Sequence, residues 1–297
     1  MNYVLTGGAG NISRPLTEKL LSAGHKVTVI GRNAENLKPL TDKGAEAAIG
    51  SVEDVAFLTE AFKGADAVYT MVPPTFAAKD WKGWIGQIGK NYADAIKAAG
   101  VKYVVNLSSI GAHLPEGVGP VSGLHRAEQH LNELTDVHVK HLRPGYFFSN
   151  LFANVGMIKG MNIFGSNISK PEEKIVFSHT NDIAEAAAEE LLNLKFTGHS
   201  VRYLASDERT PVDVAKSLGG AVGKQDLPYV EFNDDDTLNG MKGAGLPEEV
   251  AKNYTEMGHS LRTGKMSEDY QKNRPQTLGK TKLEDFAKEF AAVYNAN

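Results

Sequence analysis

The sequence predicts an α/β protein with a doubly wound parallel sheet and a smaller, helix-rich C-terminal lobe. Three observations predict this class. Short apolar runs alternate with longer amphipathic segments as far as Arg143, most connections between them are short, and a glycine-rich turn follows the first run. Alternation of this kind is typical of a parallel sheet that carries helices on both faces.

The individual elements follow from the residues in each segment. β-branched and aromatic runs predict strands, and the amphipathic segments between them predict helices. The predicted strands are Asn2–Thr6, Lys26–Ile30, Ala45–Ile49, Ala65–Met71, Lys102–Leu107 and Val137–Leu142, and the predicted helices are Ile12–Ala23, Ala34–Lys43, Val52–Phe62, Trp81–Ala99 and Leu124–Leu134.

The alternation loosens after Arg143. We therefore predict a core over residues 1–150, and a mixed segment over residues 151–297 that completes the sheet and forms the smaller lobe. Thr210 followed by Pro211 has the pattern of a helix N-cap and first turn. In this part of the chain we predict helices over Asp182–Leu194, Pro211–Leu218 and Leu283–Tyr294, and a strand over Val201–Leu204.

Composition excludes several classes of protein. The chain has 297 residues, 41% of them hydrophobic and 23% charged, a net charge of −4 and no cysteine. The lack of cysteine excludes disulfides, thiolate metal sites and a cysteine nucleophile. No His, Asp and Glu cluster has metal-ligand spacing, and no basic stripe suits nucleic acid. We expect a cytoplasmic protein, because the sequence shows no secretory signal and no run long enough to span a membrane.

The first turn carries the main functional signal. Gly7, Gly10 and Ser13 stand at three-residue spacing between the first strand and the first helix. Glycines there let the backbone approach a pyrophosphate, and the free N–H groups at a helix N-terminus favour its negative charge. The alternative is a tight turn that serves packing alone. The motif lies in the first βαβ unit, which favours a Rossmann dinucleotide site.

Arg32 indicates which dinucleotide is bound. It follows the second strand, 22 residues after Gly10, where an adenine-ribose contact is expected. An acidic residue there would hold a ribose 2′-hydroxyl and favour NAD(H), whereas a guanidinium pairs with a 2′-phosphate. The position therefore favours NADP(H) over NAD(H), the alternative being an ordinary solvated arginine.

The chain resembles the NmrA-like branch of the atypical short-chain dehydrogenases/reductases. The resemblance lies in the order of TGGAGNIS, VIGR, GAEAAIGSVEDVAFLTEAFKGADAVY, AGVKYVVNLSS and HLRPGYFFSN along most of the chain. It implies an NAD(P)-binding Rossmann fold and a cofactor site at matching positions. These are Gly7, Gly10, Asn11 and Ile12 in the first turn, Arg32 at the 2′-phosphate, Val72 and Pro73 after the fourth strand, Leu107 and Ser108 after the fifth, and Pro144, Gly145, Tyr146 and Phe147 beside the nicotinamide.

One departure from the wider superfamily concerns catalysis. Short-chain dehydrogenases typically carry Tyr-x-x-x-Lys for proton transfer, and no tyrosine in this chain is followed four residues later by lysine. The helix that should hold the pair offers His125 and Glu128 instead. His125 is the candidate proton donor, or else a partly exposed histidine without a role. We assign no catalysis to Glu128, because NmrA-like proteins commonly have an acidic residue there.

Aromatic residues near these positions leave two interpretations open. Tyr146, Phe147 and Phe148 form a run that stacks on a flat ring or packs in the core. Trp81 and Trp84 line the mouth of a cleft or pack in the core, which the sequence favours.

Three functions fit these features. The first is an NADPH-dependent reductase of a quinone or other small electrophilic acceptor, whose reduced anion needs no dedicated Tyr/Lys pair. The second is a non-enzymatic NADP(H) redox sensor that regulates a protein partner, as the resemblance to NmrA-like regulators implies. The third, an isomerase or reductase of phenolic compounds, ranks last because its family lysine is missing.

Overall fold

A computed structural model describes residues 1–296 of the chain. Its centre is a parallel sheet with seven strands in the described part, in the order β10-β6-β5-β4-β1-β2-β3. The order reverses beside β1, so a crevice is expected at the carboxyl ends of β1 and β4. The strands are β1 (Asn2–Leu5), β2 (Lys26–Gly31), β3 (Glu46–Ile49), β4 (Ala67–Thr70), β5 (Tyr103–Leu107), β6 (His138–Pro144) and β10 (His199–Leu204).

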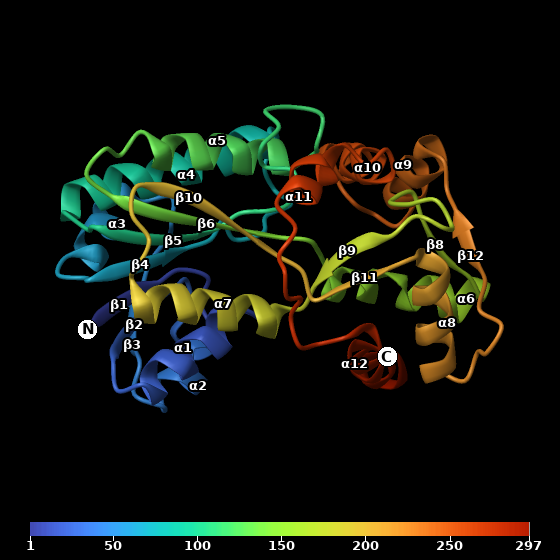
Figure 1. The fold of residues 1–297 in the computed structure, drawn as a ribbon, viewed down its shortest axis with the longest axis horizontal. Coiled ribbons are helices and arrows are strands. Elements are labelled where there is room, and N and C mark those ends of the chain that lie inside the picture. The colour runs from blue at the N-terminus through green and yellow to red at the C-terminus, as the bar shows by residue number, and fades with distance from the viewer. Residues whose placement is uncertain (297) are drawn as a thin grey trace.

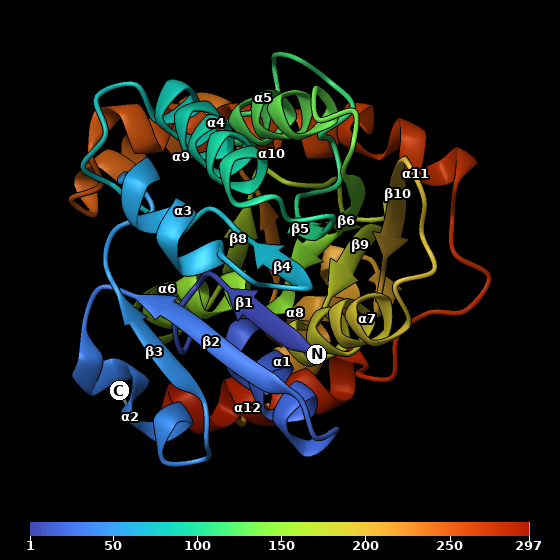
Figure 2. The same cartoon turned by 90° about the vertical axis from the view of Figure 1, so that its left-hand side faces the viewer.

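Helices cover both faces of this sheet (Figure 1). Seen along the sheet, α3, α4 and α5 lie on one side, and α1, α2 and α7 lie on the other (Figure 2). Each face buries its own apolar cluster, one around Leu16 and Leu20 of α1 and one around Ile88 and Ile96 of α4. These helices are α1 (Ser13–Ser22), α2 (Ala34–Thr41), α3 (Val55–Phe62), α4 (Trp81–Ala99), α5 (Val121–Asn132) and α7 (Thr180–Asn193).

The lobe lies at the end of the sheet where the strands finish (Figure 1). Its core is built on stacked phenylalanines, with Phe148 4.8 Å from Phe177 and 5.1 Å from Phe286 between ring centroids. Its strands are β7 (Tyr146–Phe147), β8 (Phe164–Ser166), β9 (Ile175–Ser178), β11 (Asp207–Arg209) and β12 (Tyr229–Glu231), and its helices are η1 (Phe148–Asn154), α6 (Val155–Met161), α8 (Pro211–Ala221), α9 (Asp234–Gly243), α10 (Glu248–Arg262), η2 (Lys265–Ser267), α11 (Glu268–Lys272) and α12 (Leu283–Ala296).

The predicted fold class is confirmed, and most element ends agree to within a few residues. The largest shifts are of three residues, at the starts of α3 and α5 and at the end of α8. Helix α3, predicted from Val52, begins at Val55 because the side chain of Asp54 accepts the N–H of Phe57 as an N-cap. At α8, Thr210 and Asp213 form the reciprocal capping box. Among residues 1–296, no helix is both long and apolar enough to cross a membrane.

Candidate dinucleotide-binding site

The turn after β1 has a backbone that requires glycine. Gly7 and Gly8 have φ angles of +95° and +57°, in the left-handed region. A Cβ on Gly7 would lie 2.4 Å from Oγ of Ser13 and 2.9 Å from Cγ of Met71. The Gly8 N–H donates to the carbonyl oxygen of Ile30 at 3.0 Å. The turn is therefore pressed onto the sheet edge, which leaves its outer side for a ligand.

Side chains hold this turn in place. Oγ of Ser13 donates to the carbonyl oxygen of Thr6 at 2.9 Å, and Oγ1 of Thr6 accepts the N–H of Met71 at 2.8 Å. The Tyr92 hydroxyl donates to the carbonyl oxygen of Met71 at 2.7 Å, and burial raises the pKa of this phenol. The ends of β1 and β4 are thus fixed to each other on either side of the expected crevice.

The head of α1 offers unpaired donors to an anion. The N–H groups of Asn11, Ile12 and Ser13 donate to no acceptor within residues 1–296, and no side chain caps the helix at Ile12. Its first turn also holds no acidic residue. Free amides at a helix N-terminus, reinforced by the helix dipole, are a ready binding site for phosphate. The turn fits the diphosphate of a dinucleotide.

Arg32 is exposed at the end of β2 and differs from the other arginines. Each of the other seven arginines forms an ion pair with a carboxylate, whereas Arg32 has no such partner within residues 1–296. Its neighbour Asn33 caps α2 by accepting the N–H of Glu35 at 2.8 Å. The guanidinium of Arg32 is therefore free to pair with an added anion.

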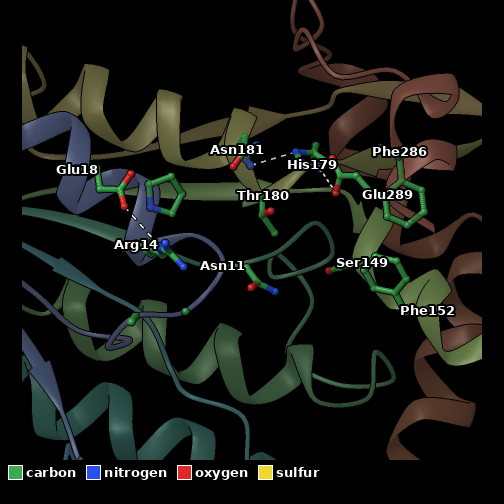
Figure 3. A pocket seen from close by; sticks show the side chains of 13 residues that line it. Asn11, Arg14, Glu18, Ser149, Phe152, His179, Thr180, Asn181, Phe286 and Glu289 are labelled. Atoms are coloured by element: carbon green, nitrogen blue, oxygen red, sulfur yellow. Dashed lines mark hydrogen bonds and ion pairs between the residues drawn. The ribbon is translucent and has the colours of Figure 1, made fainter. Parts of the chain in front are cut away.

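A cavity of about 380 Å³ flanks the turn between α1 and the lobe (Figure 3). Two predicted cofactor residues, Gly10 and Asn11, line it. The opposite wall carries His179, whose Nε2 is 3.2 Å from a carboxylate oxygen of Glu289. Nδ1 of His179 accepts the N–H of Asn181, so this histidine caps α7. The remaining lining residues are Ala9, Arg14, Pro15, Glu18, Ser149, Phe152, Thr180 and Phe286.

The other predicted cofactor residues lie at the carboxyl ends of adjacent strands. Val72 and Pro73 follow β4, Leu107 ends β5 with Ser108 after it, and Pro144 ends β6 with Gly145, Tyr146 and Phe147 after it. Parallel pairing of β4 with β5 and of β5 with β6 brings these ends to one edge of the sheet.

Ser108 leaves a polar atom unsatisfied at this edge. Its side chain is buried, and its hydroxyl has no hydrogen-bond partner within residues 1–296. The main chain beside it is held, because the Ser108 N–H donates to the carbonyl oxygen of Leu142 at 2.8 Å. A buried hydroxyl without a partner is uncommon in a native protein. The position fits contact with a polar group of a bound ligand, as expected for a residue beside the nicotinamide.

The aromatic run after β6 divides between core and edge. Phe148 is fully buried in the lobe, whereas Tyr146 and Phe147 are half-buried. Trp81 is also buried, at the start of α4. The indole N–H of Trp84 donates to Glu53 at 2.7 Å. The core interpretation therefore holds for Phe148 and Trp81.

A buried polar chain runs across β4, β5 and β6, through the paired positions Thr70, Asn106 and His141. Oδ1 of Asn106 accepts from Thr70 at 2.9 Å, so its amide nitrogen donates to Nδ1 of His141 at 3.1 Å. Nε2 of His141 then carries the hydrogen and donates to Oδ1 of Asn132 at 3.0 Å. Burial lowers the pKa of His141 to about 4. This imidazole is neutral at pH 7, in one fixed tautomer.

Glu128 has a structural partner that the sequence analysis did not identify. Its carboxylate forms a two-point pair with Arg143 of β6, at 3.0 Å to Nε and 2.5 Å to Nη2. Burial alone would lower the pKa of the Arg143 guanidinium, but its hydrogen bonds and ion pair with Glu128 hold that pKa above its usual range. Arg143 therefore keeps its charge. Its Nη1 donates to the Tyr203 hydroxyl at 3.0 Å, and that hydroxyl donates to Asp269 of α11. The available signal was an arginine within the predicted strand region, in a segment that lies largely buried as β6, HVKHLRP.

These features define a Rossmann-type fold whose first turn suits a dinucleotide. The sequence profile of the family described as NAD(P)H-binding matches residues 7–170, more than half of the chain. The chain belongs to this NAD(P)H-binding family.

Individual relatives agree with this assignment. The sterol-4-alpha-carboxylate 3-dehydrogenase (decarboxylating) of Dictyostelium discoideum is 40% identical over 67 residues, which are 23% of this chain and 20% of that enzyme. The chain thus matches only a fifth of that relative's length. Among solved structures, the NADPH-dependent quinone oxidoreductase of Escherichia coli in complex with NADPH has a TM-score of 0.78 and 22% identity, covering 97% of this chain and 99% of that one. The NADP(H) complex of the Citrobacter triphenylmethane reductase has a TM-score of 0.78 and 20% identity, covering 97% and 99%.

Proposed function

We propose that this protein is an NADPH-dependent oxidoreductase that reduces a small, flat electrophilic acceptor of the quinone type. The observation that carries the cofactor preference is Arg32, an exposed arginine without a carboxylate partner in residues 1–296, which follows β2 where an adenine-ribose contact is expected. The reductase class is supported by the Escherichia coli and Citrobacter proteins, which share the fold over nearly the whole chain.

The residues present suit an acceptor whose reduced form is a stabilised anion. When bound, NADPH supplies a hydride, so that a quinone taking this hydride and one proton from water becomes a hydroquinone and NADP⁺ remains. The chain itself positions the two molecules. Free amides at Asn11 and Ile12 bind the diphosphate, Arg32 binds the 2′-phosphate, and Ser108 contacts the nicotinamide end.

His125 is the proposed proton donor. Its Nδ1 lies 2.8 Å from the carbonyl oxygen of Ala112. Because a carbonyl only accepts, Nδ1 carries a hydrogen, which leaves Nε2 as the nitrogen proposed to face the acceptor. A hydroquinone anion also takes its proton from water, so His125 assists the reaction without being essential to it.

The test of the cofactor assignment is a binding titration of Arg32→Ala with NADPH and NADH. Loss of a charged hydrogen bond to phosphate costs about 1.5–3 kcal/mol, which corresponds to a fall of about 10- to 150-fold in NADPH affinity. NADH affinity should not change. Arg14→Ala is the matched control, since it removes the same charge near the turn and should leave the ratio of the two affinities unaltered. An equal loss for both cofactors in Arg32→Ala would overturn the assignment.

Turnover distinguishes the reductase from the sensor. NADPH oxidation should accelerate when 1,4-naphthoquinone is added to the wild-type protein. If NADPH binds tightly while a broad panel of acceptors gives background rates, the redox-sensor function is favoured. That function also needs different affinities for NADP⁺ and NADPH, because a ligand pair bound equally shifts no equilibrium.

A further inference from the structure

Three aromatic rings from two distant parts of the chain meet beside Val72, one of the predicted cofactor residues. Phe76 lies in the loop after β4, Trp81 begins α4, and Tyr254 lies in α10 of the lobe. Trp81 and Tyr254 meet edge to face with ring centroids 5.2 Å apart. Phe76 lies 6.0 Å from Trp81 and 6.4 Å from Tyr254, also edge to face.

The three rings differ in how much of each side chain is exposed to solvent. Trp81 is buried and supports the group, whereas Phe76 is 49% exposed, among the most exposed large apolar side chains of the protein. Leaving a phenyl ring half in water is unfavourable by about 25 cal/mol for each Å² that could be buried. The ring is fixed by two aromatic neighbours while its outer part has no cover. This arrangement presents an aromatic surface to a ligand.

The group borders the predicted cofactor residues. Tyr254 and Val72 belong to the same apolar cluster, built on Trp81, Ile85 and Val250. Tyr254 also lies close enough to Tyr146 for the two phenols to interact electrostatically, which adds to burial in raising the pKa of Tyr146. Tyr254 is thus placed near residues that follow both β4 and β6.

The hydroxyl of Tyr254 is available to a ligand. It forms no hydrogen bond with any group in residues 1–296. Burial raises the pKa of this phenol, so it keeps its proton at neutral pH. A neutral phenol that lacks a partner is a hydrogen-bond donor for a carbonyl oxygen. Quinones and other conjugated carbonyl compounds carry such an oxygen on a flat ring.

We infer that Phe76, Trp81 and Tyr254 form the acceptor subsite, with a conjugated carbonyl compound packed on Phe76 and its oxygen accepting a hydrogen bond from Tyr254. This inference rests on the proposed function, since it names where that acceptor binds. Trp81 supports the other two rings from behind. The subsite transfers no proton. It holds the acceptor, and α10 of the lobe therefore contributes to substrate specificity.

The first experiment measures reduction of 1,4-naphthoquinone with NADPH by the full-length chain. Tyr254→Phe keeps the ring and removes the donor, so KM for the quinone should rise about two- to tenfold, the range for one neutral hydrogen bond. Phe76→Ala should raise KM as well, because it removes the packing surface. Both variants should keep the wild-type NADPH dissociation constant. Tyr294→Phe in α12 is the matched control and should keep wild-type KM. Unchanged KM in Tyr254→Phe and Phe76→Ala would overturn the inference.

A second measurement keeps the subsite testable without turnover. Naphthoquinone is titrated against tryptophan fluorescence in the presence of NADP⁺, using Trp81 as a nearby reporter. Weaker quinone binding by Tyr254→Phe and Phe76→Ala than by Tyr294→Phe supports the subsite even if the wild type reduces no quinone, in which case the proposed activity alone fails. Equal quinone binding by all three variants, or no quinone binding by the wild type, overturns the subsite.

Discussion

The proposed cofactor turn and the proposed acceptor subsite are built in different ways. The proposed cofactor turn is made of main chain from one short stretch, Thr6 to Ser13, and the donors that it offers are backbone N–H groups. The proposed acceptor subsite is made of side chains from the loop after β4, from α4 and from α10. A site built from the backbone of one short stretch can be recognised from a local sequence motif. A site built from side chains of distant segments depends on how the whole chain folds.

The largest expected effect comes from breaking the buried ion pair between Glu128 of α5 and Arg143 of β6. Glu128→Ala removes the two-point carboxylate partner of the buried Arg143 guanidinium and leaves only the longer ion-pair contact to Asp269, at 3.5 Å. Loss of one partner of a buried pair costs about 3–5 kcal/mol. Chemical denaturation should show this fall in the free energy of unfolding. The double variant Glu128→Leu with Arg143→Met should recover part of it, because no buried charge remains. A single variant as stable as the wild type would contradict the role given to the pair.

The next effect concerns His141, which lies in the same strand, β6, as Arg143. Its folded-state pKa of about 4 is below the ordinary value of 6.5, so the unfolded chain takes up a proton first as the pH falls. This contribution is complete above pH 6.5 and is lost toward pH 4, by about 3 kcal/mol at 1.36 kcal/mol for each pH unit. Denaturation across this range should show a steep dependence for the wild type and a shallower one for His141→Gln. Identical slopes would exclude His141 as the source.

The smallest effect on stability, and the sharpest on binding, comes from the cofactor turn. Gly7→Ala strains a positive φ and forces a Cβ against Ser13, at a cost of about 1–3 kcal/mol. NADPH affinity should fall at least about tenfold, since a shift equivalent to 1.4 kcal/mol is a factor of ten. Gly24→Ala has the same sign of φ, +82°, with no atom within 4 Å of the new Cβ. Gly24→Ala should lower the free energy of unfolding only by the cost of the strained φ, and it should keep wild-type NADPH affinity. An equal loss of NADPH affinity in Gly7→Ala and Gly24→Ala would refute the special role of Gly7.

The same contrast explains what the sequence could predict. Strand and helix patterns through Arg143 predicted the parallel sheet, which the structure confirms. The glycine turn with Arg32 predicted a cofactor site from a few neighbouring residues. Tyr254 lies 182 residues after Val72 in the chain and carries no local motif, so only the fold places the two in one apolar cluster. Glu128 and Arg143 likewise become a pair only when α5 packs on β6. The cofactor and catalytic roles of the predicted residues, and the domain boundary at residue 150, stay predictions.

The path of the chain between core and lobe has a consequence for any attempt to separate them. After β6 the polypeptide enters the lobe, returns as α7 and β10, and leaves again for α8 to α12. The apolar cluster around α1 takes Ile183, Ala187 and Leu191 from the returning helix α7. A fragment that stops before α7 would expose the apolar face of α1. It would also leave one edge of β6 without its hydrogen-bonded neighbour β10. Experiments that separate the roles of core and lobe should therefore use point substitutions rather than truncations. The chain passes between the two more than once, so neither is expected to fold alone when the other is removed.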